Sequence, residues 1–393
     1  MEKVVVAYSG GLDTSYCVKY LQHELNLEVH SVLVNTGGFS EEELKVVEAK
    51  AYNMGVVSHT NQNILDIYYE KAIKFMVYGN VLKNNTYPLS VSAERVFQAI
   101  EVVEYAKKIN AKYIAHGSTG AGNDQVRFDM IFQTLAPEIE IITPIRDLKL
   151  SRQEEIDYLK KHGVDYPWSK AKYSINKGIW GTSIGGVETL TSHQALPEDA
   201  YPSQLEKTEP TNIKLHFKKG QLVGLNDEYD TAVNTILKIE EIASKYAIGR
   251  DIHVGDTIVG IKGRVGFEAA AATVIIKAHH LLEKHVLSKW QQNLKENIGS
   301  TYGMLLHDGQ YFEPAMRDLE AFLTNSQKTV TGIVFVTLKP YHFTLNGVES
   351  KHDLMKSKFG EYGETNKAWS SEDAKGFIKI LGVANKIYHS VNT

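Results

Sequence analysis

Cysteine is almost absent from this chain: among 393 residues, only Cys17 is a cysteine. A single cysteine excludes a disulfide within the chain, and it excludes a Cys-x-x-Cys metal or redox site. Cys17 falls in a predicted helix. Because free cysteines are often buried, we expect it to be a small buried hydrophobic residue and not a nucleophile.

Long apolar runs and an excess of one charge are also missing. No apolar run approaches the roughly 20 residues that cross a bilayer, and no basic leader segment with a cleavage site precedes the first strand. We therefore expect a cytoplasmic protein with no membrane partner. The 43 basic and 47 acidic residues give a net charge of −4 without a block of like charge. This balance predicts no nucleic-acid partner and favours small-molecule substrates.

Predicted strands and helices alternate over the first 165 residues. Apolar, β-branched runs predict strands at 4–7, 28–34, 56–60, 113–115 and 139–142. Helices are predicted at 13–23, 64–77 and 93–109, and at two further segments that begin with the capping boxes Ser40/Glu43 and Ser151/Glu154. This alternation predicts an α/β fold with a parallel sheet. Such sheets bind ligands at the carboxyl ends of their strands.

The pattern changes after about Tyr166 to that of an α+β domain. Segments 213–226 and 330–350 look like paired strands, and helical patterns cover 231–246 and 271–297. A final helix is predicted at 371–391, with an apolar stripe that we expect to mark a partner surface. The stripe consists of Ala374, Phe377, Ile378, Leu381 and Tyr388. The boundaries predict three parts: 1–165, 166–369 and 370–393.

The stretch AYSGGLDTS, residues 7–15, joins the first strand to the first helix. A glycine-rich turn at this place points backbone N–H groups and the helix dipole at a ligand, so it can hold phosphate without a lysine. Asp13 fits a role in holding Mg²⁺ beside the phosphates. The stretch is neither a Walker A loop nor G-x-G-x-x-G. The alternative is an ordinary tight turn.

The stretch resembles the SGGxDS-type pyrophosphate loop of the N-type ATP pyrophosphatases, which cleave ATP to AMP and pyrophosphate. This resemblance implies a nucleotide-binding domain of the adenine nucleotide α-hydrolase type, with ATP as co-substrate and Mg²⁺ near Asp13. The ATP-binding residues it implies are Ala7, Tyr8, Ser9, Gly10, Gly11, Leu12, Asp13, Thr14, Ser15, Val34, His116 and Gly117.

A second glycine-rich loop, HGSTGAGNDQVRFD, covers residues 116–129. It brings hydroxyl, amide, carboxylate and guanidinium groups together, which suits a zwitterionic amino acid. Asn123 and Arg127 lie four residues apart and would share a helix face. The alternative is a surface loop in which Asp124 caps the helix.

This second loop resembles the HGxTGxGNDQVRF signature of the argininosuccinate synthase family. TYPLSVSAER (86–95, at Tyr87, Ser92 and Arg95) and YSINKGIWGTS (173–183) resemble further segments of that family, so the likeness covers nearly the whole chain. It implies a synthetase and oligomerisation domain after the nucleotide-binding domain, a homotetramer, and ATP-dependent joining of L-citrulline to L-aspartate, with Asp13 and Asp124 as catalytic residues. The implied aspartate-binding residues are Thr119, Asn123 and Asp124. The implied citrulline-binding residues are Tyr87, Ser92, Asn123, Arg127, Ser174 and Ser183.

The chain departs from the family pattern at three places, which together cover five residues. The family commonly has Asp-Glu-Asn where this chain has Asn176-Lys177-Gly178. A family glutamate that contacts citrulline aligns with Gly255, and a family tyrosine aligns with Phe267. The chain thus resembles a divergent branch, and its citrulline contacts from the second half stay open.

Two alternative functions also stay open: a ligase of the same superfamily with another acceptor, and a nucleotide sensor without catalysis. Other residues of note have simpler interpretations. Zinc sites need three or four ligands, so we expect His279 and His280 to be packed or solvated. We expect the four tryptophans, Trp168, Trp180, Trp290 and Trp369, to serve packing.

Overall fold

The first half of the chain builds a five-stranded parallel sheet. The computed structural model describes residues 1–168, 172–359 and 368–393. The strand order is β3-β2-β1-β4-β5, and every neighbouring pair is parallel. The strands are β1 (Lys3–Ala7), β2 (Glu28–Asn35), β3 (Ser58–Asn63), β4 (Tyr113–Ala115) and β5 (Glu140–Ile142). The predicted α/β fold is confirmed, although β3 begins two residues later than expected.

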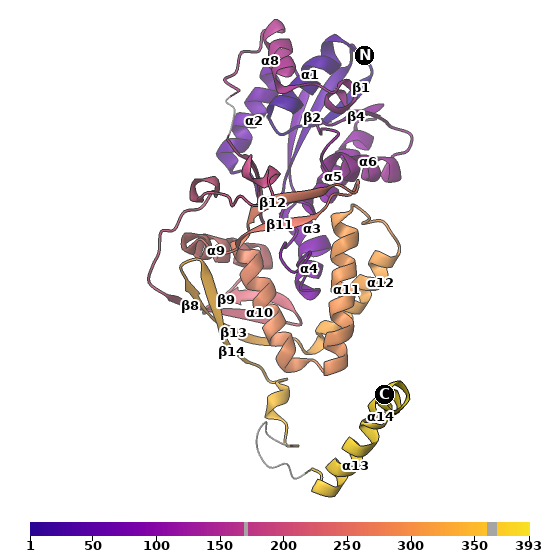
Figure 1. Cartoon of the computed structure of the whole chain (residues 1–393). Helices are drawn as coiled ribbons and strands as arrows, with labels where there is room; N and C mark the ends of the chain where they lie inside the picture. The colour runs from indigo at the N-terminus through magenta and orange to yellow at the C-terminus, as the bar shows by residue number, and fades with distance from the viewer. Residues whose placement is uncertain (169–171, 360–367) are drawn as a thin grey trace.

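Helices cover both faces of this sheet (Figure 1). Val4 and Val6 of β1 pack with three helices on one face, whereas Val5 belongs to the cluster on the other face. Successive side chains of a strand point to opposite faces, which is why a run of valines serves both layers. The first face carries α1 (Leu12–His23), α2 (Glu41–Asn53) and α8 (Arg152–Lys161), and the second carries α5 (Glu94–Lys108) and α6 (Asp124–Leu135). A short helix, α7 (Pro144–Leu148), follows β5.

Capping decides where two of these helices begin. Ser40 and Ser151 each accept a hydrogen bond from the backbone N–H three residues later, and Glu43 and Glu154 bond back to the capping residue. Both predicted capping boxes are confirmed.

The helix predicted at 64–77 is interrupted. It consists of α3 (Leu65–Tyr68), a π-helical turn (Tyr69–Ile73) and α4 (Lys74–Tyr78). This segment leaves the parallel sheet and contacts three helices of the second half, α10, α11 and α12. It joins the apolar interiors of both halves into one cluster.

Two antiparallel sheets form the second half. Their strand orders are β10-β9-β8-β13-β14 and β11-β12-β7-β6. The strands of the first are β8 (Thr211–Lys218), β9 (Gln221–Leu225), β10 (Glu228–Tyr229), β13 (Gly332–Lys339) and β14 (His342–Glu349). Those of the second are β6 (Ser174–Gly178), β7 (Gly181–Gly185), β11 (Arg250–Asp256) and β12 (Lys262–Glu268). In Figure 1 the hairpin β11–β12 lies between the parallel sheet and the rest of the second half.

Four longer helices pack in this half. They are α9 (Ala232–Ala243), α10 (Ala270–Val286), α11 (Lys289–His307) and α12 (Ala315–Ser326). The expectation of one helical stretch over 271–297 is wrong. Leu287 has extended dihedral angles, and Ser288 starts a new helix with a capping box to Gln291. The apolar pattern continues across this break, whereas the capping pair Ser288 and Gln291 marks it.

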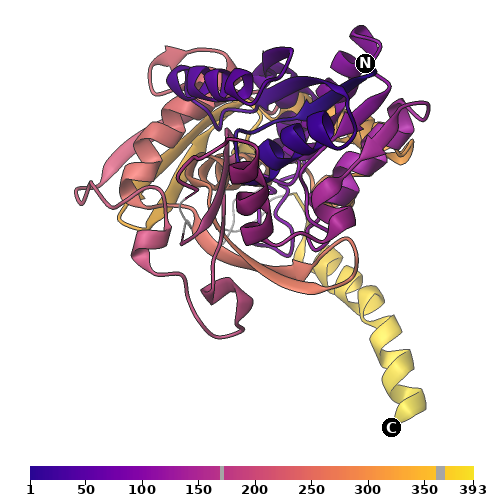
Figure 2. The ribbon, with the colours of Figure 1, turned by 90° about the horizontal axis from the view of Figure 1, so that it is seen from above.

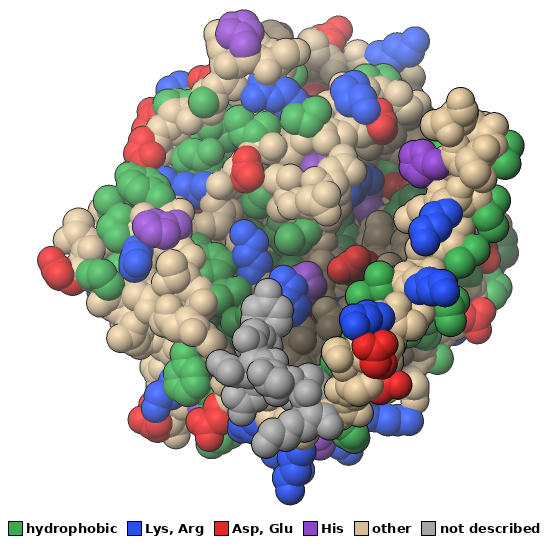
Figure 3. Space-filling view, turned by 60° about the horizontal axis from the view of Figure 1, so that its bottom comes forward, with side chains coloured by type: hydrophobic (Ala, Val, Ile, Leu, Met, Phe, Trp, Pro, Cys, Tyr) green, Lys and Arg blue, Asp and Glu red, His purple; other side chains and the backbone are tan. Residues whose placement is uncertain are grey.

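The C-terminal residues form an arm that projects from the body (Figures 1 and 2). The arm contains α13 (Ser371–Leu381) and α14 (Val383–Asn392), so the predicted single helix is broken at Gly382. Neither helix has a buried residue, and Phe377 and Leu381 are about two-thirds exposed (65% and 66%). Hydrophobic side chains run along the arm in Figure 3.

The cysteine, one of the two neighbouring histidines and three of the tryptophans differ in how far they are buried. Cys17 is fully buried, as expected, and His279 is packed between the amide oxygens of Asn80 and Gln327. Trp180 is buried, but Trp290 and Trp369 are exposed on this chain. The expectation that all four tryptophans serve packing is therefore wrong for Trp290 and Trp369. Among the helices that the structure describes, none combines the length and the apolar character needed to cross a membrane.

Candidate active site

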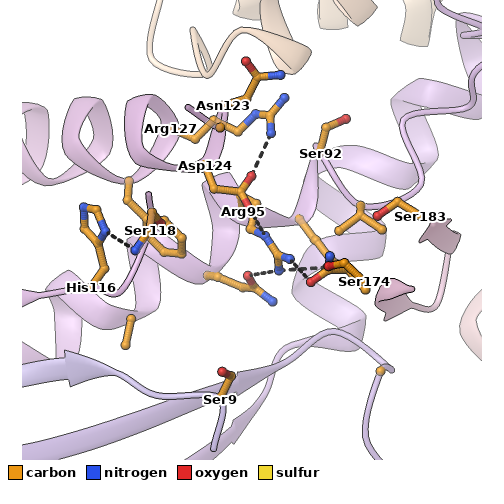
Figure 4. A pocket seen from close by; sticks show the side chains of 18 of the residues that line it. Ser9, Ser92, Arg95, His116, Ser118, Asn123, Asp124, Arg127, Ser174 and Ser183 are labelled. Atoms are coloured by element: carbon orange, nitrogen blue, oxygen red, sulfur yellow. Dashed lines mark hydrogen bonds and ion pairs between the residues drawn. The ribbon is translucent and has the colours of Figure 1, made fainter. Parts of the chain in front are cut away.

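A cavity of about 910 Å³ opens at the carboxyl ends of the parallel strands. Three groups of elements line it: the loops that follow β1, β2 and β4, the start of α5, and the two hairpins β6–β7 and β11–β12. Figure 4 shows labelled side chains from the first two groups and from β6–β7 around one space. The parallel-sheet topology explains the meeting of the loops, because neighbouring parallel strands end at the same edge.

The loop after β1 has the conformation that a phosphate-binding turn needs. Gly10 has a φ of +75°, a region that glycine adopts without strain. Lys50 of α2 donates a hydrogen bond to the Gly10 carbonyl, and its ammonium group also lies 4.0 Å from the Trp168 ring centre. Ser15 bonds to the Gly11 carbonyl at 2.7 Å instead of facing the cavity.

Ten of the twelve residues predicted to bind ATP line the cavity. They are Ala7, Tyr8, Ser9, Gly11, Leu12, Asp13, Thr14, Val34, His116 and Gly117. Gly10 and Ser15 are not among the lining residues. Gly10 sets the backbone conformation of the turn, and Ser15 bonds to the backbone of the turn on the side away from the cavity.

His116 and Gly117 join the two glycine-rich loops. His116 Nε2 lies 2.8 Å from Asp129 Oδ1, and its Nδ1 accepts a hydrogen bond from the Ser118 backbone at 3.2 Å. A Cβ atom on Gly117 would approach the backbone of Asp13 to 3.1 Å. The second loop therefore packs directly against the first turn of α1.

Asp124 lies between two guanidinium groups. Its Oδ2 accepts from Arg95 Nε, and its Oδ1 accepts from Arg127 Nη1, both at 3.0 Å (Figure 4). Burial acts to raise the pKa of the Asp124 carboxyl, but the two arginines outweigh it, so that this pKa lies below its usual range. The residue that precedes α6 as its N-cap is Asn123, so the interpretation of Asp124 as a helix cap is wrong.

Arg127 keeps part of its guanidinium free. Its side chain is buried, with Nε bonded to the His307 carbonyl at 2.9 Å and Nη1 bonded to Asp124. Nη2 has no hydrogen-bond partner among the residues that the structure describes, and it is shielded from solvent. A buried cationic donor without a partner is costly, and a ligand carboxylate in the cavity would satisfy it.

Thr119, Asn123 and the residues predicted to contact citrulline also line the cavity. The latter are Tyr87, Ser92, Asn123, Arg127, Ser174 and Ser183. In the described part of the chain the buried Ser92 hydroxyl has no hydrogen-bond partner, which leaves it free for a ligand. Asn123 accepts a hydrogen bond from the Ile258 backbone, so it also holds the tip of the β11–β12 hairpin.

The departure at Gly255 on β11 has a structural explanation. A Cβ atom on Gly255 would come within 2.6 Å of His253 Nε2. The His253 ring stacks on Tyr87 with 5.1 Å between centroids, and Phe267 packs on the other part of Tyr87 at 5.4 Å. The His253 side chain therefore occupies the space that a side chain at position 255 would need.

Sequence reasoning missed several lining residues. They include Thr36, Glu94, Gln98, Asn176, His253 and His307. Five of them belong to helices or strands or to their ends, whereas Thr36 lies in the loop after β2, directly before Gly37 and Gly38. The signals in the sequence were those two glycines, the departure at 176 and the Ser-Ala-Glu-Arg string.

Asp13 is the candidate metal contact. Its carboxylate lines the cavity beside the phosphate loop, and the nearly buried Glu155 of α8 faces it from behind. Burial, and then the Asp13 charge, raise the pKa of Glu155 to about 8. Among residues 1–168, 172–359 and 368–393, no three His, Cys, Asp or Glu side chains gather as a metal site.

A glycine-rich turn at the edge of a parallel sheet, facing a second loop that carries hydroxyl, amide and carboxylate groups, is typical of an ATP-using ligase of the HUP class. Two family models match the chain: the arginosuccinate synthase N-terminal HUP domain over residues 3–165, and the arginosuccinate synthase C-terminal domain over residues 173–388. The chain belongs to the argininosuccinate synthase family.

Relatives match along their full length. The argininosuccinate synthase of Dictyoglomus turgidum is 39% identical over 389 residues, which cover 98% of this chain and 97% of the relative. That of Methanocaldococcus jannaschii is 37% identical over 392 residues, covering 99% and 98%. That of Pyrococcus furiosus is 38% identical over 393 residues, covering 99% and 95%.

Proposed function

We propose that this chain joins L-citrulline to L-aspartate and cleaves ATP to AMP and pyrophosphate. The ureido oxygen of citrulline bonds to the α-phosphorus while the bond to the β-phosphate oxygen breaks. The aspartate amine then bonds to the activated carbon, the carbon–oxygen bond to AMP breaks, and the amine loses its proton. The observation that carries this proposal is one cavity that unites a phosphate turn with the Arg95–Asp124–Arg127 cluster.

The first half-reaction uses the edge of the parallel sheet. Backbone N–H groups of residues 9–14 and the α1 dipole would stabilise the departing pyrophosphate. Asp13 offers a hard oxygen ligand beside the phosphates, which fits Mg²⁺. When bound there, Mg²⁺ would neutralise part of the phosphate charge. Val34, at the end of β2, would contact the adenine.

The amino-acid sites divide between the second loop and the hairpins. Thr119, Asn123 and Asp124 would hold aspartate. The free Nη2 of Arg127 supports a carboxylate contact to citrulline, and the unpartnered Ser92 hydroxyl supports a further contact. Tyr87, Asn123, Ser174 and Ser183 would complete that site.

The assembly and the parts of the chain belong to the same proposal. Residues 1–165 would bind the nucleotide, 166–369 would complete the amino-acid sites, and 370–393 would join subunits in a homotetramer. The exposed apolar residues of α13 and α14 support this role, since apolar patches on this scale usually mark partner surfaces.

One assay separates this function from its rivals. Pyrophosphate release from ATP is measured with citrulline and aspartate, each alone and both together. We expect full turnover only with both. A ligase for another acceptor would ignore citrulline, and a nucleotide sensor would release no pyrophosphate under any condition.

A further inference from the structure

Glu94, the first residue of α5, places a buried carboxyl group beside the candidate site. Its side chain is only 1% exposed. Oε2 accepts a hydrogen bond from the Thr36 hydroxyl at 2.7 Å, and Oε1 accepts from Arg95 Nη1 at 3.2 Å. Through Arg95 this carboxyl connects directly to Asp124.

Arg95 is held on every side of its guanidinium group. Besides Glu94 and Asp124, Nη1 donates to Gln98 at 2.8 Å and Nη2 donates to Asn176 at 3.1 Å. Of these four partners only Glu94 and Asp124 can carry negative charge, and only Glu94 is almost wholly shielded from water. Glu94 is therefore the buried anion among the four groups that hold Arg95.

Gly178, on β6, provides the room for this carboxyl. A Cβ atom at position 178 would lie 2.1 Å from Glu94 Oε2, closer than any contact between non-bonded atoms. This is the position at which the chain departs from the family pattern, where an asparagine is common. The glycine at 178 and the glutamate at 94 thus form a structural pair.

We propose that Glu94 is a positioning residue for the ligation step. Its carboxylate fixes Arg95 so that Arg95 and Arg127 together hold Asp124 in the aspartate site, and Gly178 is required for this arrangement. The inference rests on the proposed function, because it takes Asp124 as part of the aspartate site.

The proposed role makes ligation depend on the ionisation of one carboxyl group. Burial raises the pKa of Glu94 to about 7, against the opposing effect of Arg95. The other titratable groups near it are Asp124 and Tyr68, and Lys177 of β6 lines the same cavity. Above pH 7 the carboxylate is charged and Arg95 is held. Below pH 7 the group becomes neutral and resembles a glutamine.

The test compares wild type with Glu94→Gln across pH 6–8.5. We expect kcat/KM for aspartate to be about tenfold lower in the variant at pH 8.5, as for loss of a charged hydrogen-bond partner, and the ratio to approach one near pH 6. Taking the ratio removes ionisations that both enzymes share, including that of the substrate amine. Glu101→Gln, on the same helix, is the matched control and should leave the ratio near one throughout.

A ratio for Glu94→Gln that does not change with pH would overturn the positioning role. Absence of any citrulline- and aspartate-dependent turnover in wild type would instead overturn the proposed function. Glu94→Asp keeps the charge, so it should recover more activity at pH 8.5 than Glu94→Gln does.

A second measurement does not depend on activity. We expect Gly178→Ala to lower the unfolding temperature, and to lower it much less when Glu94→Ala is also present. Gly185→Ala is the control on the partner strand β7, because its Cβ would meet Ser174 at an ordinary 3.8 Å. Equal effects of Gly178→Ala with and without Glu94 would show that the two residues are not paired.

Discussion

Asp124→Asn removes one negative charge and keeps the shape of the side chain. In the structure this carboxylate accepts one hydrogen bond from each of two guanidinium groups, both at 3.0 Å. The asparagine leaves Arg95 and Arg127 without the anion between them, and it removes the carboxylate that would attract the protonated amine of aspartate. The second half-reaction alone uses that amine, so ligation should suffer more than adenylation.

The geometry gives the size of the effect. Hydrogen bonds to charged groups contribute about 1.5–3 kcal/mol each. The Asp124 side chain is 41% exposed, so the lower end of that range applies, and because the asparagine oxygen still accepts one of the two bonds, the bond that is lost amounts to about 1.5 kcal/mol. At 1.36 kcal/mol for each factor of ten, we expect argininosuccinate formation to fall on the order of 10-fold.

The assay follows the ureido oxygen. Citrulline labelled with ¹⁸O in the ureido group transfers the label to AMP only if adenylation occurred, so single-turnover samples are quenched, hydrolysed and examined for labelled AMP and argininosuccinate. We expect labelled AMP to persist while argininosuccinate is lost. Asp318→Asn, at an exposed acidic residue in the first turn of α12, is the control.

Two results would refute the reasoning. Ligation at the wild-type rate would show that the carboxylate has no part in binding or positioning aspartate. Loss of labelled AMP to the same degree as loss of argininosuccinate would place Asp124 in the ATP or citrulline half-reaction.

Three further predictions concern other parts of the molecule. Gly10→Val should reduce pyrophosphate release about 100-fold or more, because φ is +75° there and the new side chain would meet Val47. The control Gly163→Val, at the same φ with open space around it, should stay active. Equal loss of activity in both variants would contradict the assignment of the phosphate turn. Removal of residues 371–393 should lower the mass measured by light scattering, whereas an unchanged mass would mean that the arm does not join subunits. Burial raises the pKa of the Cys17 thiol, so iodoacetamide should label it only after unfolding, and labelling of the native enzyme within minutes would contradict its buried position.

The phosphate turn and the second loop could be predicted because their signals are local. Glycines, a carboxylate and capping residues lie within a few positions of one another, and parallel-strand topology brings the loops to one edge. The break between α10 and α11 was missed because the apolar period continues through Leu287, and the capping residues Ser288 and Gln291 that mark the start of α11 lie inside that period.

Glu94 escaped prediction for a different reason. An acidic residue in the first turn of a helix is the commonest arrangement that helix electrostatics favour, so position 94 carries no unusual signal. Its partners Thr36 and Gly178 come from distant parts of the sequence and meet it only in three dimensions. The pair can be recognised only from the distance between a Cβ atom placed on Gly178 and the carboxylate oxygen of Glu94.

The interrupted segment α3–α4 has a consequence for folding. Tyr68 and Met76 share one apolar cluster with Leu282 and Tyr302, although the two family models divide the chain between residues 165 and 173. Elements that share a core lose their stabilising contacts together. Calorimetry of the whole chain should therefore show the two halves unfolding in a single transition. Residues 1–165 produced alone would expose the apolar surface of α3–α4 to water and should aggregate.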